Sequence, residues 1–493
     1  MGNIKFVNGK IYTGRNNFID SFGISDGKFV IKSLGGFDKV KDLNGKCVLP
    51  GFIDSHTHIT HAGIHKLGLD LKDSKKLDEI FERIDDFINN NERNIYFAYG
   101  FDESILKENR FPTKKELDEI VSGRPFYIQR RDQHSLIVNS EFEKKYGISS
   151  KDGFVNASTY EKIKIELLKN FQRKDYTRAL NIMQKIAFKN GITTLHTMEG
   201  AKNYKKPIEY LMKNKDNYKL DFIIYPQILD IDWVVKNGFD KIGGCILLDG
   251  SFGSRTAALK EEYSDSSDGK GTLYFKDSEL YKFVEKAHLK NLQLSFHAIG
   301  DRAIEQILDV YEKVLNKYPK KNHQYRIEHF ELATEEMIKK ASDLDLQIAY
   351  QPVFEYLWNY KNGMYEKRLG KKRMMQTNRY KTALNHNLKF SFGSDCDVTP
   401  LNPLLGIYSA VNRFNIKENI SVRDAINAFT INSAEMGKSS NLYGSIEEDK
   451  MADFIILDED IFEISKSKIK NIKINEVYKK GKSVFKEDLW KIG

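Results

Sequence analysis

Two histidines separated by a single residue follow a short apolar run near the start of the chain. His56 and His58 come shortly after Phe52-Ile53. In a β-strand, residues two apart point to the same face, so both imidazoles can reach one point at the end of a buried strand. Imidazole nitrogen is a common metal ligand. The pair therefore indicates a metal site, although this spacing also occurs in unrelated surface histidines.

Three further polar residues each end a later apolar run: His297, His329 and Asp395. A lone histidine in such a place is more often a structural residue held by a hydrogen bond. Four histidines and an aspartate, all at the ends of expected strands, are difficult to obtain by chance. Imidazole and carboxylate ligands suit Zn²⁺, and catalytic zinc keeps one position open for water. The set predicts a catalytic metal centre.

The elements that must position these residues are short buried strands alternating with helices. Helical spacing is clear after the fifth run, where Ile304, Ile307, Leu308 and Tyr311 recur on one face. Eight strands that alternate with helices and carry polar residues at their C-terminal ends predict an α/β fold, a (β/α)₈ TIM barrel. The eight apolar runs are Gly51–Asp54, Ile192–Leu195, Phe222–Tyr225, Cys245–Leu248, Leu292–Phe296, Tyr325–Ile327, Leu346–Ala349 and Leu388–Phe392.

The two ends of the chain differ from the middle because both consist of short alternating strands and turns. Asn8-Gly9 and Asp26-Gly27 are typical hairpin turns. We expect residues 1–50 and 440–493 to form one small β-sandwich, and residues 51–439 to form the barrel domain. The gap after the first barrel strand is too long for one helix and contains strand-like segments. Residues from about 68 to 170 are therefore expected to be an inserted subdomain.

Composition excludes several classes of protein. The chain has 493 residues, of which 40% are hydrophobic, and a net charge of +9 that is dispersed along the sequence. No nucleic-acid-binding motif accompanies the short basic clusters, so we expect a small-molecule substrate and no nucleic acid. Cys47, Cys245 and Cys396 are too few and scattered for a disulfide framework. With no signal peptide or membrane span recognised, a cytoplasmic protein without a membrane partner is expected, with a homodimer as the candidate assembly.

The sequence resembles the amidohydrolase superfamily, and within it the branch that contains N-substituted formamide deformylases. The likeness covers nearly the whole chain. The segments that carry it are Pro50–His58, Phe101–Glu103, Arg130–Ser140, Gly191–His196, Asp249–Leu259, His297–Ala303, Arg326–His329, Gly393–Asp395 and Ala452–Leu457.

This resemblance implies one or two zinc ions, or another divalent transition metal, held by the four histidines and Asp395. The branch usually has a lysine four residues before Asp-Gly-Ser, and in many superfamily members that lysine is carboxylated and bridges two metals. Here the aligned residue is Cys245. A cysteine cannot form the carbamate, but its thiolate can bind zinc directly. The alternative is an inert buried cysteine beside a single metal.

The predicted activity is hydrolysis of a C–N bond in an amide, N-formyl or cyclic amide group by metal-activated water, with Asp395 as general base and then general acid. Arg255, His134 and His196 are candidates for substrate binding, and each has a structural alternative as a scaffold or core residue. Two other functions stay open from sequence: a metal-dependent lyase or isomerase on the same barrel, and a degenerate, non-catalytic binding protein.

Overall fold

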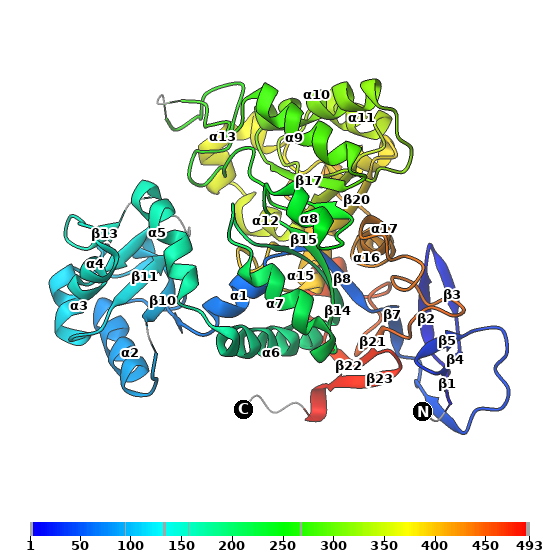
Figure 1. Ribbon diagram of the computed structural model, residues 1–493. Helices are drawn as coiled ribbons and strands as arrows, with labels where there is room; N and C mark the ends of the chain where they lie inside the picture. Colours follow the sequence, from blue (N-terminus) through cyan, green and yellow to red (C-terminus); the bar gives the residue numbers. More distant parts are fainter. Residues whose placement is uncertain (1–2, 94, 132–134, 156, 267–268, 490–493) are drawn as a thin grey trace. The chain divides into compact units, whose positions relative to one another are not determined.

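The computed structural model describes residues 3–93, 95–131, 135–155, 157–266 and 269–489. The chain divides into two compact units (Figure 1). One unit is Thr60–Met183, and the other combines Met1–Ile59 with Gln184–Gly493. The first of these encloses the insertion expected at 68–170, although the predicted domain limits themselves stay predictions.

The larger unit contains eight parallel strands in two sheets. A three-stranded sheet has the order β15-β14-β8, and a five-stranded sheet has the order β16-β17-β18-β19-β20. Nearly every residue in these strands is buried, which explains why they read as short continuous apolar runs. The strands are β8 (Phe52–Thr57), β14 (Ile192–Glu199), β15 (Asp221–Pro226), β16 (Lys241–Ile242), β17 (Gln293–Ala298), β18 (Arg326–His329), β19 (Gln347–Tyr350) and β20 (Lys389–Phe392).

Individual hydrogen bonds link the two sheets at both junctions. Beyond the end of β20, Asp395 N donates to His56 O in β8 at 2.8 Å, and His58 N donates to Cys396 O at 3.1 Å. At the other junction, Gly243 N donates to Pro226 O at 2.9 Å. The first junction joins the first and the last of these eight strands in sequence order, and it brings His56 next to Asp395.

Helices alternate with these strands, as the sequence predicts. In α10 (Asp301–Lys317), the buried residues include Ile304, Ile307, Leu308 and Tyr311, so the expected helical face is the one that packs inward. The other helices of this unit between and after the strands are α7 (Lys206–Asn214), α8 (Ile231–Lys236), α9 (Asp277–Leu289), α11 (Glu335–Asp343), α12 (Pro352–Trp358), α13 (Met364–Met374), α14 (Tyr380–Asn385), α15 (Pro403–Val411), α16 (Val422–Ala428) and α17 (Ile431–Met436).

Strands from both termini pair with one another in this unit (Figure 1). A six-stranded sheet has the order β23-β22-β21-β7-β2-β3, and a four-stranded sheet has the order β5-β4-β1-β6. Phe6, Phe22, Phe454 and Tyr478, from both sheets, belong to one buried apolar cluster. The strands are β1 (Ile4–Val7), β2 (Lys10–Gly14), β3 (Asn17–Ile19), β4 (Phe22–Ser25), β5 (Lys28–Val30), β6 (Lys39–Asp42), β7 (Cys47–Pro50), β21 (Phe454–Leu457), β22 (Ile474–Lys479) and β23 (Lys482–Lys486).

Only one of the two expected hairpins forms. Asp26 and Gly27 both have positive φ and join the antiparallel pair β4 and β5, as predicted. The prediction at Asn8-Gly9 is wrong, because β1 pairs with β4 and β6 while β2 pairs with β3 and β7. The turn there carries the chain from one sheet to the other, and a turn signal alone does not specify which strands pair.

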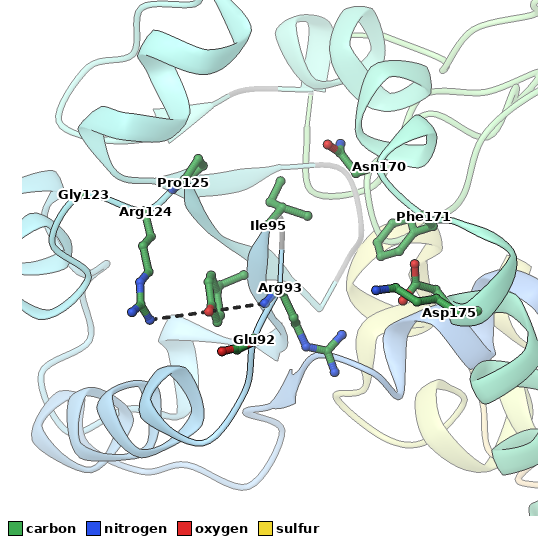
Figure 2. A pocket seen from close by; sticks show the side chains of 11 residues that line it. Glu92, Arg93, Ile95, Gly123, Arg124, Pro125, Asn170, Phe171 and Asp175 are labelled. Atoms are coloured by element: carbon green, nitrogen blue, oxygen red, sulfur yellow. Dashed lines mark hydrogen bonds between the residues drawn. The ribbon is translucent and has the colours of Figure 1, made fainter.

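The unit Thr60–Met183 has its own five-stranded sheet, of order β13-β12-β11-β10-β9, and its own apolar cluster. A cavity of about 460 Å³ lies within this unit, with Arg93, Arg124 and Asp175 among its lining residues (Figure 2). Because charges of both signs line it, the cavity does not favour one class of ligand. The elements are β9 (Leu69–Asp70), β10 (Tyr96–Phe101), β11 (Phe126–Arg130), β12 (Leu136–Val138), β13 (Phe154–Val155), α2 (Leu77–Asn89), α3 (Lys114–Ile120), α4 (Ser140–Tyr146) and α5 (Ala157–Lys169).

Two helices, α1 (Ile59–His65) and α6 (Arg173–Lys189), run across the limits of the units. Among the residues that the structure describes, none of the helices combines the length and the apolar character needed to cross a lipid bilayer.

Candidate metal centre

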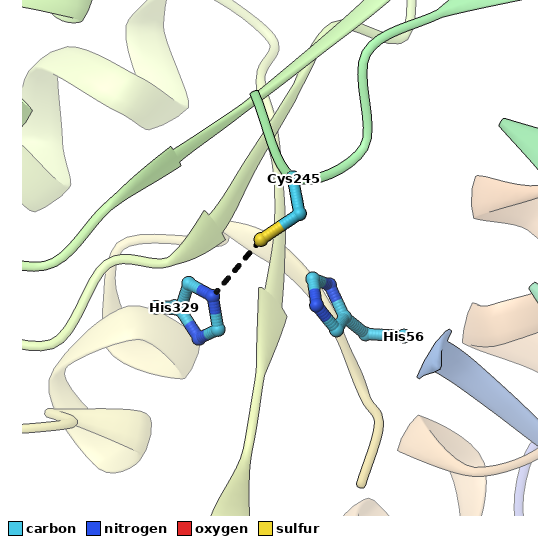
Figure 3. Close-up of side chains that lie close together, drawn as sticks. All are labelled: His56, Cys245 and His329. Carbon is cyan, nitrogen blue, oxygen red and sulfur yellow. Dashed lines mark hydrogen bonds between the residues drawn. The ribbon is translucent and has the colours of Figure 1, made fainter. Parts of the chain in front are cut away.

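The C-terminal ends of the parallel strands bring together the residues predicted to bind metal. Figure 3 shows three of them, His56 from β8, Cys245 from the segment after β16, and His329 from the end of β18. Each of these three residues offers one ligand atom, and the three atoms lie within 4.8 Å of one another. All three side chains are buried. Such a group can hold a metal ion.

The thiol of Cys245 faces the histidines. Its Sγ lies 3.6 Å from Nδ1 of His297 and 3.9 Å from Nε2 of His329 (Figure 3). The side chain is 6% exposed. The residue that the resemblance aligns with a bridging lysine therefore directs its sulfur atom toward these histidines.

A second group of ligand atoms forms around Asp395. Its Oδ1 lies 3.4 Å from Nε2 of His56 and 3.3 Å from Nε2 of His58. The ligand atoms of these three residues again lie within 4.8 Å of one another. The two groups share His56, so the predicted residues form one continuous cluster.

Hydrogen bonds on the far side of three imidazoles determine which nitrogen faces the cluster. Nδ1 of His56 lies 2.6 Å from Glu328 Oε2, and Nδ1 of His58 lies 3.1 Å from the carbonyl oxygen of Met198. Nε2 of His297 lies 3.0 Å from the carbonyl oxygen of Gly250. Since these oxygens accept protons, the opposite nitrogens carry the lone pairs when the imidazoles are neutral.

Two buried imidazole nitrogens at this site have no hydrogen-bond partner within the described part of the chain: His56 Nε2 and His329 Nδ1. The contact of His56 Nε2 with Asp395 has the distance of an ion pair without the geometry of a hydrogen bond. Buried polar atoms are rarely left unpaired, because each costs roughly 1–3 kcal/mol. Of the two, His56 Nε2 faces the cluster, and an unpaired nitrogen among imidazole, thiol and carboxylate groups fits a divalent metal ion.

The electrostatics of the cluster favour two anions. Burial disfavours the thiolate of Cys245, but hydrogen bonds with His297 and His329 outweigh burial and hold the pKa of this thiol well below its usual range. Burial likewise opposes ionisation of Asp395, yet the neighbouring imidazoles of His56 and His58 hold the pKa of this carboxyl well below its usual range. Two negative charges beside four imidazoles are suited to a divalent cation.

Cys245 reaches this position by a route that differs from the prediction. The expected strand at 245–248 is observed as β16, which ends at Ile242. Gly243 and Gly244 follow with φ of 109° and 82°. A Cβ on Gly243 would lie 1.9 Å from Ser295 O, so only glycine allows this close approach. Cys245 is buried but Leu247, two residues further on, is 42% exposed, so the alternation of a strand does not continue through this segment.

Asp249 organises the loop that follows. Its buried carboxylate accepts hydrogen bonds from the backbone N–H groups of Ala258, Ile299 and Gly300, at 2.8, 3.0 and 2.8 Å. Its Oδ1 also lies 3.4 Å from Nε2 of His297. The aspartate thus fixes the loop and the end of β17 against each other, which holds the His297 ring in place.

Two of the three residues predicted to bind substrate, Arg255 and His196, pair with other protein groups. Arg255 pairs with Asp265 in its own loop, through two contacts of 3.0 Å. His196 is 0% exposed, and its Nδ1 lies 3.1 Å from Arg326 Nη1, so it occupies the interior between the strands. His134 lies outside the described residues. Their roles in substrate binding stay predictions, and the geometry favours the structural alternative for Arg255 and His196.

Sequence reasoning did not single out Glu328. It lies one residue before His329, is 0% exposed, and contacts His56. A signal was present, because Arg326 and Glu328 are two residues apart in a short buried strand and therefore share a face. Opposite charges on one buried face indicate an ion pair inside the fold.

Comparison with known proteins agrees with this geometry. The Bacillus subtilis protein YtcJ, which bears the name of an amidohydrolase, is 27% identical over 519 residues, covering 94% of this chain and 95% of YtcJ. N-substituted formamide deformylase of Arthrobacter pascens is 22% identical and covers 98% of each chain. The crystal structure of an uncharacterized metal-dependent hydrolase from Pyrococcus furiosus is 26% identical, covers 94% of this chain and 100% of that chain, and has a TM-score of 0.79.

The fold and the cluster of potential ligands define a metal-dependent hydrolase with a TIM-barrel-like α/β fold. Residues 39–485 match the amidohydrolase family, and the chain belongs to that family. It is accordingly a hydrolase that acts on carbon–nitrogen bonds. The predicted family and class of enzyme are confirmed, and the lyase, isomerase and non-catalytic alternatives gain no support.

Proposed function

We propose that this chain is a zinc-dependent amidohydrolase that cleaves the C–N bond of an amide, N-formyl or cyclic amide group in a small molecule. The observation that carries the proposal is the convergence of thiol, imidazole and carboxylate groups from separate strands, with the Cys245 sulfur 3.6 Å from His297. The relative from Arthrobacter pascens, named for deformylating N-substituted formamides, supports the N-formyl group as a candidate substrate.

The proposed ligands are the Nε2 atoms of His56, His58 and His329, Nδ1 of His297, the Cys245 thiolate and the Asp395 carboxylate. Another divalent transition metal suits the same donors, but thiolate together with imidazole favours zinc. The two overlapping groups of ligands allow one ion or two. Because Nδ1 of His56 is engaged by Glu328, His56 can serve only one ion. Cys245, His297 and His329 would be the residues left to hold a second ion.

When bound, Zn²⁺ supplies a Lewis acid that polarises the carbonyl group and makes a water molecule more acidic. Asp395 accepts the proton of the attacking water and then donates it to the leaving nitrogen, so it is first a general base and then a general acid. The low pKa of Asp395 keeps the carboxylate ionised for the first of these steps. Oδ1 of this carboxylate lies 3.4 Å and 3.3 Å from Nε2 of His56 and His58, so the proton acceptor lies among the proposed ligands.

The fold supports two finer proposals. We infer that the eight parallel strands close into a (β/α)₈ barrel, which the bonds of Asp395 to His56 and of Gly243 to Pro226 support. The two sheets made by the termini would form a β-sandwich around their shared aromatic cluster. A cytoplasmic location and a homodimer are the expected setting.

Metal analysis and a substrate screen test the proposal. Protein purified without chelator should contain at least one equivalent of zinc per chain. It should hydrolyse members of a panel of N-formyl, N-acyl and cyclic amides, and solvent ¹⁸O should enter the acid product. A protein that lacks a stoichiometric transition metal and stays inactive after zinc addition would contradict the proposal.

A further inference from the structure

A buried ion pair lies beside the candidate ligands, inside the layer of parallel strands. Nε and Nη2 of Arg326 donate to the two carboxylate oxygens of Glu328, at 2.8 and 2.9 Å, and both residues are 0% exposed. Branched aliphatic side chains usually fill the interior of such barrels. A buried ion pair is weak evidence for stability, because desolvation can exceed the attraction between the charges. Its presence therefore calls for another explanation.

The second partner of Glu328 provides that explanation. Glu328 Oε2 lies 2.6 Å from Nδ1 of His56. Because an ionised carboxylate only accepts hydrogen bonds, the His56 proton must be on Nδ1. Nε2 of His56 then carries the lone pair, and it is the buried nitrogen that has no hydrogen-bond partner within the described residues.

Other contacts prevent the Glu328 carboxylate from turning away. Ser295 Oγ donates to Oε1 on the side opposite His56. Arg326 is fixed in turn, since Nη2 donates to Ser55 O at 2.9 Å and its guanidinium lies 4.5 Å from the ring centre of Tyr225. The carboxylate therefore has a fixed orientation, and the guanidinium compensates its charge.

We propose that Glu328 is a positioning residue that holds His56 in the Nδ1-protonated tautomer with Nε2 directed at the metal, and that Arg326 fixes and neutralises the Glu328 carboxylate. This inference rests on the proposed metal centre, because Glu328 acts through one of its ligands. It assigns a role to two residues that the proposed chemistry does not otherwise use.

Glu328→Gln tests the tautomer directly. With its oxygen toward Ser295 Oγ and Nε of Arg326, the glutamine amide directs its NH₂ group toward Nδ1 of His56 and Nη2 of Arg326. An NH₂ donor forces the imidazole proton onto Nε2, the atom that must bind metal. In ¹⁵N-histidine NMR of the metal-free protein, recorded at a pH at which His56 is neutral, we expect His56 to change from the Nδ1–H to the Nε2–H form. Zinc affinity, measured by competition with a chromophoric chelator, should fall about 10–100-fold.

Glu355→Gln is the matched control. Glu355 is 3% exposed and accepts a hydrogen bond of 2.8 Å from another buried arginine, Arg413. Its remaining hydrogen-bond partners are Asn359, Thr377 and Asn378, so it contacts no proposed ligand among the described residues. This variant removes a comparable buried charge. It should alter stability while leaving the His56 tautomer and the zinc affinity unchanged.

If Glu328→Gln does not fold, the double variant Arg326→Met/Glu328→Gln removes both charges and should show the same loss of affinity. Unchanged zinc affinity and an Nδ1–H tautomer in a folded Glu328 variant would overturn the inference, as would an equal loss in Glu355→Gln. A wild-type protein that binds no metal would instead refute the proposed function, and the His56 tautomer of that protein would still report on the contact with Glu328.

Discussion

Ser394 donates its backbone N–H to both carboxylate oxygens of Asp54, at 3.0 and 3.1 Å. Asp54 lies in β8 and is 0% exposed, and its Oδ1 also accepts the backbone N–H of His56 at 3.1 Å. One side chain therefore fixes the backbone on both sides of the contact between His56 and Asp395. The alignment of these two proposed ligands depends on Asp54, which is not itself one of the proposed ligands.

Asp54→Asn should destabilise the larger unit. The amide replaces one acceptor by a donor, which then faces a backbone N–H, and an unsatisfied buried group costs about 1–3 kcal/mol in the free energy of unfolding. Urea denaturation measures the loss. The control is Asp118→Asn, where the carboxylate accepts from Ser140 N at 2.8 Å in an exposed setting. That change should cost no more than about 0.5 kcal/mol, and equal losses in the two variants would contradict the role given to Asp54.

Replacing His56 and His58 together by alanine should remove bound metal and activity while leaving most of the fold. Both imidazoles contact Asp395, and the three residues together form one group of potential ligand atoms. Metal analysis and far-UV circular dichroism measure the two parts of this expectation. His386→Ala is the control, because His386 contacts Glu335 at 3.1 Å outside the cluster. A double variant that keeps its zinc would refute the assignment.

Asp395→Asn should lower kcat by roughly 10²–10⁴, the usual contribution of a general acid–base group. The amide keeps the shape of the side chain and one metal-binding oxygen, but it cannot take up a proton. Metal content should stay close to the wild-type value, which separates loss of chemistry from loss of the metal. A fully active variant would show that the proton acceptor is another group.

Cys245→Ala should lower metal content, because it removes a thiolate that lies among the histidines. In the cobalt-substituted wild-type protein, a thiolate-to-metal charge-transfer band should be present, and the Ala variant should lack it. Cys47→Ala is the control, since Cys47 is buried in the terminal sheets. Absence of the band in the wild type together with unchanged metal content in Cys245→Ala would make Cys245 a packing residue.

The contact between Arg255 and Asp265 distinguishes the two roles considered for the arginine. If Arg255 only holds its loop, Arg255→Ala should have a small effect on KM, and the double variant should be no worse than Asp265→Ala, which also releases Arg368. If Arg255 leaves Asp265 to bind substrate, Arg255→Ala alone should raise KM strongly. Steady-state kinetics of the three variants decide between these outcomes.

The structure brings the predicted histidines and Asp395 close together, because each of them ends or follows a buried strand. Alternation and parallel packing bring such positions together without any knowledge of loops. Cys245 also lies among these residues, but its strand was placed too late, because Gly243 and Gly244 interrupt the extended backbone. The prediction there used hydrophobicity alone.

Contacts between distant segments could not be predicted in the same way. The pairing of Glu328 with His56 depends on the register of strands far apart in sequence, which hydrophobic patterning does not specify. Arg255 meets Asp265 because of the conformation of an irregular loop. Similarly, Asn8-Gly9 indicated a turn correctly but not the sheets that the flanking strands join.

The bond between Asp54 and Ser394 also has a consequence for synthesis of the protein. These residues lie 340 positions apart, so β8 cannot acquire this neighbour until nearly the whole chain has left the ribosome. Until then one edge of β8, the strand that carries His56, lacks this neighbour. Non-local pairing of this kind is slow to form and prone to aggregation. Because Asp395 directly follows Ser394, the complete set of proposed ligands also forms only after this part of the chain has been translated.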